Sequence, residues 1–248
     1  MKDPRPKFYK PYDVARSMNK LEKVQKLVAE LLDNDNSGHG IEHTNRVLRL
    51  SLEFAENQPA NNEVVYLIAL LHDVDDYKLF SAETAEKLTN ARNILNDCNI
   101  EDDIKEQVIT AIKTLGYSKR LQGIIPTTIE GKIVSDADMC DGMGATGILR
   151  SYQYNIAHHR PFFDRNVFPV LGMSAEEYKA KTDGTVVTHI FEKILRLKDL
   201  MLTELGQKEA IKRHCIMVDF LYHFFEEEAA PEWTKYLDDY LVQDQINY

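Results

Sequence analysis

A continuous apolar run that ends in a group of ionisable residues constrains this chain most. Residues Leu67–Phe80 read LIALLHDVDDYKLF. An apolar run without a polar face is typical of a helix that its neighbours cover on most sides. His72, Asp73, Asp75 and Asp76 follow directly, and such groups at the end of a buried helix cost free energy unless they are paired or bind a metal ion. The stretch predicts either a capped helix end with an ordinary His-Asp pair or a metal site.

The remaining sequence predicts helices and no strand. No segment shows sustained alternation of apolar and polar residues, and none carries a two-residue hairpin signal between apolar runs. Apolar residues recur at helical spacing in several segments, which we expect to be helices: Leu21–Leu32, Ile41–Glu56, Ser81–Asp97, Ile104–Leu115, Ile129–Asp141, Val186–Leu205, Gln207–Glu228 and Glu232–Val242. The sequence therefore predicts an all-α, single-domain helical bundle.

Three stretches lack this periodicity and are predicted to be irregular. Residues 1–17 are polar and interrupted by Pro, and we interpret them as an N-terminal arm before a domain at 18–248. GYSKRLQGIIPTT, at 116–128, is expected to be a loop. The aromatic segment at about 152–184 is predicted to form a lid, whose aromatic residues either stack on a base or pack over the core.

The overall charge narrows the class of partner. A formal net charge of -10 at pH 7 and a pI near 5.3 argue against a nucleic-acid polymer or an anionic membrane surface as a partner. The 3 cysteines are far apart, which indicates neither a disulfide framework nor a cysteine zinc site. No apolar run approaches the length of a membrane span, so we expect a cytoplasmic enzyme or binding protein. The sequence does not indicate its oligomeric state.

Two further residues elsewhere in the chain complete a set of complementary ligand types. His43 lies near the start of its predicted helix, and Asp138 ends the triplet Asp136–Asp138. With His72 and Asp73 they provide two imidazoles and two carboxylates. A mixed nitrogen and oxygen set suits a divalent ion such as Mn, Fe, Co or Ni and leaves positions for water and substrate.

This arrangement of H, HD and D in an all-α chain resembles the HD-domain metal-dependent phosphohydrolases. His43 stands in HTNRV, the pair in LLHDVDDYK and Asp138 in VSDADMCDGMGATGILR. Together with THIFEKILRLKDLM and LTELGQKEAIKRH, these segments are similar to a bacterial-type subgroup of small stand-alone HD hydrolases, with coverage from about Leu21 to Glu228.

The resemblance implies roles for individual residues. It implies one divalent metal ion, Mn, Fe, Co, Ni or Mg, bound by His43, His72, Asp73 and Asp138, and it implies Asp76 as the group that transfers a proton. Residues expected to contact the substrate are Arg46, Lys78, Asp141, His158, His159, Arg160, His189 and Lys193. His39 lies between two glycines and is expected to line the site without binding the metal.

The expected activity is hydrolysis of a small phosphate ester, most simply a nucleotide, by metal-activated water. Two alternatives stay open. The first is a helical regulatory or binding module that keeps the metal for structure, and the second is an HD-type oxygenase. Such oxygenases hold two irons and need further histidines between the HD pair and the last Asp, whereas this chain has none between Asp73 and Asp138.

Overall fold

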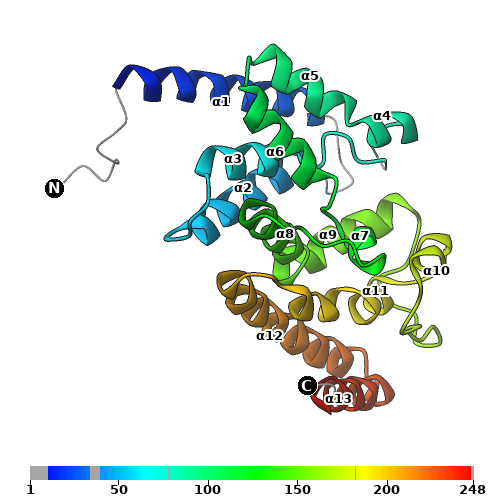
Figure 1. The fold of residues 1–248 in the computed structure, drawn as a ribbon. Helices are drawn as coiled ribbons and strands as arrows, with labels where there is room; N and C mark the ends of the chain where they lie inside the picture. The colour runs from blue at the N-terminus through cyan, green and yellow to red at the C-terminus, as the bar shows by residue number, and fades with distance from the viewer. Residues whose placement is uncertain (1–10, 34–39, 78, 182, 247–248) are drawn as a thin grey trace. The chain divides into compact units, whose positions relative to one another are not determined.

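The computed structural model describes residues 11–33, 40–77, 79–181 and 183–246, and these residues form helices and no strand (Figure 1). The predicted all-α class is therefore confirmed. The chain divides into two compact units, one made of Met1–Leu115 and Pro126–Val134 and the other of Gly116–Ile125 and Ser135–Tyr248. No linker marks this division in the sequence, because the boundary passes through a helix, α8 (Ile129–Asp141).

The first unit is built around one short helix that is apolar on every side. Its elements besides the start of α8 are α1 (Pro11–Leu32), α2 (Ile41–Ala55), α3 (Asn62–Leu71), α4 (Ala82–Lys87), α5 (Thr89–Asp97) and α6 (Asp102–Ile112). Helix α3 packs against α1, α2 and α6 (Figure 1). Its residues from Leu67 to Leu71 have no exposed surface. Burial on all sides explains why the sequence of α3 lacks a polar stripe.

Capping fixes where α3 begins. The Asn61 side chain accepts hydrogen bonds from the backbone N–H groups of Glu63 and Val64, and the Asn61 N–H donates to Glu130 Oε1 at the start of α8. These bonds satisfy donors that a helix N-terminus otherwise leaves open. The cap thus fixes the start of α3, and His72 follows the last residue of this helix.

The prediction of a single helix from Ser81 to Asp97 is wrong, because the helix is interrupted between α4 and α5. Leu88 has a φ of 51° and ends α4 in the left-handed region. The Asp75 carboxylate accepts hydrogen bonds from the N–H groups of Asn90 and Ala91, at 2.8 and 2.9 Å. A carboxylate at a helix N-terminus stabilises a new start there, so a residue distant in sequence determines where α5 begins.

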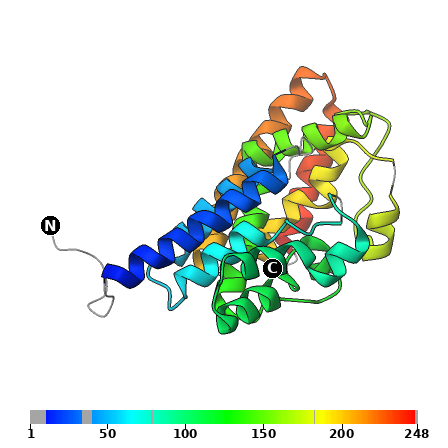
Figure 2. The same ribbon diagram turned by 90° about the horizontal axis from the view of Figure 1, so that it is seen from above.

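The second unit is centred on the longest helix of the described chain. Its elements besides the end of α8 are α7 (Tyr117–Leu121), α9 (Gly144–Ala157), α10 (Ala175–Ala180), α11 (Val186–Glu192), the 3-10 helix η1 (Ile194–Leu200), α12 (Glu204–Glu227) and α13 (Pro231–Ile246). Helix α12 packs against α9, α13 and η1, and α11 packs against α9 and η1 (Figure 2).

The aromatic segment expected to be a lid is fastened to the C-terminal helices. Phe163 and Phe168 lie 5.2 and 4.5 Å from the Trp233 ring, measured between ring centroids. The Trp233 indole donates to the Arg165 carbonyl, and Arg165 forms an ion pair with Glu232. These aromatic residues pack over the core, which is the second of the two arrangements expected for them. Helix α9 reaches Ala157, so the irregular segment begins later than predicted, and movement of it as a lid stays a prediction.

The prediction of one long helix from Val186 to Leu205 is also wrong. Helix α11 ends at Glu192, Lys193 has a φ of -130°, and the chain continues as the 3-10 helix η1. Residues Tyr117–Leu121, expected in a loop, form the short helix α7. Helix α1 begins at Pro11, inside the arm predicted at 1–17, whose first ten residues lie outside the described part. No described helix is long and apolar enough to cross a membrane.

Candidate metal centre

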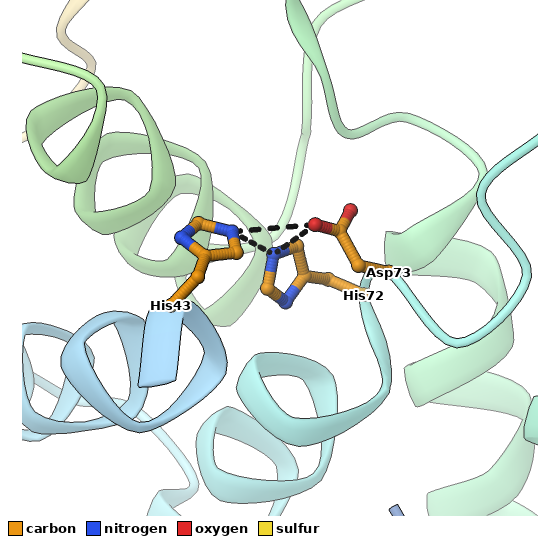
Figure 3. A group of neighbouring side chains, drawn as sticks. All are labelled: His43, His72 and Asp73. Carbon is orange, nitrogen blue, oxygen red and sulfur yellow. Dashed lines mark hydrogen bonds and ion pairs between the residues drawn. The ribbon is translucent and has the colours of Figure 1, made fainter. Parts of the chain in front are cut away.

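Three predicted ligands converge in the first unit. His43 projects from α2, and His72 and Asp73 follow the last residue of α3, so that their ligand atoms face one another (Figure 3). The two Nε2 atoms lie 3.1 Å apart, and each lies 3.3 Å from Asp73 Oδ2. Residues separated by about thirty positions thus present three lone-pair donors to one point.

The spacing of the three atoms fits a divalent metal ion. Ligands at right angles and about 2.1 Å from one ion lie about 3 Å from each other, close to the observed edges. The imidazoles of His43 and His72 are 1% and 2% exposed, whereas the Asp73 side chain is 16% exposed. The site is therefore dry on the imidazole side and accessible on the carboxylate side.

A hydrogen bond fixes the chemical form of His72. Its Nδ1 lies 2.8 Å from the Ala69 carbonyl oxygen, which can only accept, so Nδ1 carries the proton. The Nε2 of a neutral His72 is then a lone pair aimed at the Nε2 of His43. Two nitrogens and a carboxylate oxygen at these distances repel one another unless a cation or a proton lies among them. The donor set therefore fits the metal ion that the sequence predicts.

The local charge balance favours an ionised carboxylate at Asp73. Burial by itself would raise the pKa of Asp73, but the adjacent His72 and the hydrogen bond from His43 hold that pKa well below its usual value. An ionised carboxylate between two imidazoles is the form that binds a divalent cation.

Neighbouring acids of the same turn have other surroundings. Asp75 is buried and caps α5, as described above, so it points away from the three ligand atoms. Burial raises the pKa of Asp75, and the hydrogen bonds from Ala91 and Asn90 oppose this. Asp76 is half-buried, and its carbonyl accepts from the N–H groups of Leu79 and Phe80, which closes the turn. Its role in proton transfer stays a prediction.

The DAD triplet lies on α8, in the part that belongs to the second unit. Asp136 has no exposed surface, and its carboxylate accepts hydrogen bonds from Leu202 N–H and from the N–H and hydroxyl of Thr203. Asp136 is therefore a buried acceptor for the donors that precede α12. A Cβ on Gly206 would lie 2.4 Å from Asp136 Oδ2, so the close approach of α12 requires glycine there.

The other two acids of α8 differ in their contacts. Asp138 is half-buried, and its role as the fourth ligand stays a prediction. Asp141 is buried and forms an ion pair with Arg150 of α9, at 2.9 Å. This pair holds α8 to α9, and the substrate contact expected of Asp141 stays a prediction.

The remaining predicted substrate residues occupy three different places. Arg46 lies one turn after His43 on α2, and Lys78 lies outside the described residues. His158 and His159 are exposed at the end of α9, where the His158 ring stacks on Tyr154 and Arg160 follows. His189 and Lys193 lie at the end of α11. The structure tests none of these assignments as substrate contacts.

Sequence reasoning missed an aromatic and basic group in the second unit. The Lys193 ammonium lies 5.0 Å from the centre of the Tyr117 ring. Burial raises the pKa of Tyr117, and the positive charge of Arg196 lowers it in part. The order Gly-Tyr-Ser-Lys-Arg at 116–120 held a signal, since a tyrosine among basic residues in a presumed loop is a candidate binding group.

The sequence is similar to those of known proteins. A model of the HD domain matches residues 40–143. The chain is 29% identical to YpgQ of Bacillus subtilis over 208 residues, which cover 83% of this chain and 92% of YpgQ.

Three solved structures show the same similarity over most of the chain. A Lactobacillus plantarum protein is 31% identical, with a TM-score of 0.75 and coverage of 86% of this chain and 98% of its own. An HD-superfamily hydrolase of Bacillus thuringiensis is 29% identical, with a TM-score of 0.66 and coverage of 86% and 99%. YpgQ in complex with ADP is 25% identical, with a TM-score of 0.66 and coverage of 86% and 96%.

Proposed function

The chain belongs to the HD-domain family, and from this premise we propose that it is a metal-dependent phosphohydrolase that acts on nucleotides or related phosphate esters. The observation that carries the proposal is the convergence of His43, His72 and Asp73, whose ligand atoms lie 3.1 to 3.3 Å apart. A buried arrangement of this kind costs stability unless a cation binds there. Similarity to an HD-superfamily hydrolase supports the reaction class.

In the proposed site, His43, His72, Asp73 and Asp138 hold one divalent ion. Such an ion supplies Lewis acidity, which lowers the pKa of a water molecule and polarises a phosphoryl oxygen. Four protein ligands would leave such an ion accessible to solvent and substrate. The hydrogen bond from His72 to the Ala69 carbonyl keeps the imidazole in the form that binds the ion.

Other residues of the chain transfer the proton and stabilise the negative charge of the phosphate group. Asp76, three residues after Asp73, accepts or donates the proton as the general acid or base. Arg46, His189 and Lys193 bind the non-bridging oxygens, on which charge accumulates in the transition state. A protein with a net charge of -10 needs such local positive groups to bind a phosphate ester.

The nucleotide part of the proposal is supported by a relative. YpgQ of Bacillus subtilis, 25% identical in its solved complex, binds ADP. A cytoplasmic location, expected from the composition, accords with this substrate class and stays a prediction.

The test is a screen of nucleotides and simple phosphate esters with Mn²⁺, Mg²⁺, Co²⁺ and Ni²⁺, in which phosphate and pyrophosphate are measured separately. We expect turnover that depends on the metal and is lost with a chelator. Metal binding without turnover of any ester would favour the regulatory module instead. An iron content near two per chain would favour the oxygenase.

A further inference from the structure

An exposed apolar stripe runs along helix α9. Leu149, Tyr152 and Ile156 follow one another at intervals of three and four residues, and Ala145 extends the stripe toward the start of the helix. Leu149 is 67% exposed and Ile156 is 52% exposed. Alternating intervals of three and four place residues on one helix face, which is the pattern by which two helices pair. Helix α9 therefore has an apolar face toward solvent besides the one that it buries.

The apolar surface continues from α9 onto α12, which packs beside it in the second unit. The Phe162 ring joins the two helices, since it lies 5.8 Å from the Tyr152 ring and 6.2 Å from the Phe220 ring, measured between centroids. Ile216, one turn before Phe220, is 48% exposed. We call this surface the α9–α12 face, and it consists of Leu149, Tyr152, Ile156, Ile216 and Phe220. A contiguous apolar surface, unlike a single exposed residue, is typical of an interaction site.

The exposed charges of α12 are sorted along its length. Lys208 and Lys212 lie before Ile216, whereas Asp219 and Glu226 lie after it, and all four are exposed. The two lysines form ion pairs within the helix, with Glu204 and Glu209. Exposed pairs of this kind contribute little free energy, so both lysines stay available to another partner.

This order of charges is complementary to itself only when the direction of the helix is reversed. Ile216 lies at the middle of α12, which extends from Glu204 to Glu227. A second α12 in antiparallel orientation would place Lys212 opposite Asp219 of the second copy, and the reverse. A parallel orientation would oppose like charges and is disfavoured. A two-fold axis uses the same surface twice and therefore requires such self-complementarity.

We propose that the α9–α12 face binds the same face of a second copy of this chain, with the two α12 helices antiparallel across a two-fold axis near Ile216. Helices of about 36 and 21 Å in length and about 10 Å in width offer roughly 600 Å² per copy, at the lower end for specific interfaces. We therefore expect a dimer that dissociates when diluted to about micromolar concentration. The proposal goes beyond the proposed function and does not depend on it.

The experiment is sedimentation velocity of the full-length protein over a range of about 1 to about 100 μM. The wild type should be mainly dimeric at the highest concentration. Lys212→Asp opposes two acids, and Asp219→Lys opposes two bases, so each should weaken association by about tenfold or more. The double variant Lys212→Asp/Asp219→Lys again opposes unlike charges and should recover most of the affinity. Residues seven apart on one helix are about 10 Å apart, so this recovery reports contact between copies.

Two controls match the substitutions within the face. Leu149→Ser should abolish the dimer, whereas Val242→Ser, which alters a residue of α13 that is 57% exposed, should keep the wild-type affinity. Lys235→Asp reverses an exposed charge of α13 and should also leave association unchanged. Circular dichroism shows whether each variant is folded.

The outcomes decide the proposal. A wild type that is monomeric over the whole range would overturn it. So would a dimer that Lys212→Asp and Asp219→Lys leave unchanged, or one that the double variant does not recover. Should Leu149→Ser fail to fold, the three charge variants, whose substitutions are at exposed positions, provide the answer.

Discussion

Two short acidic stretches, one in each unit, each hold two aspartates separated by one residue, and we expect each stretch to contain one metal ligand and one structural acid. In the turn after α3, Asp73 faces two imidazoles while Asp75 caps α5. On α8, Asp138 is the predicted ligand while Asp136 binds the N–H groups that precede α12. Residues two apart on a helical turn point in nearly opposite directions, so we expect one acid of each pair to bind the metal and the other to fix the helix beside it.

The comparison teaches how to separate ligand acids from structural acids. Every strong contact of Asp136 and Asp75 is a hydrogen bond from a backbone or hydroxyl donor, which satisfies a buried carboxylate. Asp73 instead faces two imidazole nitrogens, which are metal ligands as well as hydrogen-bonding groups. Substitutions should therefore affect metal binding in one class and stability in the other.

The largest effect is expected for His72→Ala. Loss of one ligand should abolish bound metal and lower turnover by about a thousandfold or more, because water is no longer activated. Metal content by mass spectrometry and the rate with the best ester measure it, with the exposed His223→Ala as the control. Retention of stoichiometric metal in His72→Ala would contradict the ligand assignment.

Asp138→Ala tests the predicted ligand of the second stretch in the same way. It should lose metal and activity as His72→Ala does, while the free energy of unfolding of the metal-free protein changes little. Normal metal content in this variant would break the parallel between the two stretches.

Asp76→Ala should separate binding from chemistry. We expect bound metal at the wild-type level and a rate lower by about a hundredfold to ten-thousandfold, the usual contribution of a general acid or base. Metal content and kcat are compared in the same preparation. Full activity would show that Asp76 does not transfer the proton.

Asp136→Ala should act on stability. It leaves the partly buried N–H groups of Leu202 and Thr203 without the carboxylate that accepts from them, which should cost about 2 to 4 kcal/mol of unfolding free energy. Urea denaturation measures this loss. Asp239→Ala, which removes an exposed partner of Lys235, should cost less than about 0.5 kcal/mol. Equal effects of the two variants would refute the structural role of Asp136.

The smallest effect is expected for Asp75→Ala, which removes the cap of α5. The loss should be about 1 to 2 kcal/mol, as for other helix N-caps, and bound metal should stay at the wild-type level. Asp75→Asn keeps one acceptor oxygen and should lose less. A loss of metal in Asp75→Asn would place Asp75 among the ligands and end the distinction drawn above.

The errors in the predicted helix ends arise from contacts between residues that are remote in sequence, as do the structural roles of Asp75 and Asp136. The break at Leu88 depends on the Asp75 carboxylate, which reaches the N–H of Asn90 from 15 residues away. The break at Lys193 accompanies the contact of Lys193 with Tyr117, on a different helix. Periodicity within a segment cannot reveal either partner, because both become neighbours only when the chain folds.

The amino-acid sequence alone determined the all-α class and the residue types of a metal site, because helical periodicity and side-chain chemistry are properties of short stretches. The tertiary structure decided which buried acids are satisfied by backbone donors, where two helices end, and that Tyr117 lies beside Lys193. These features depend on the free energy of burying polar groups next to partners that are remote in sequence.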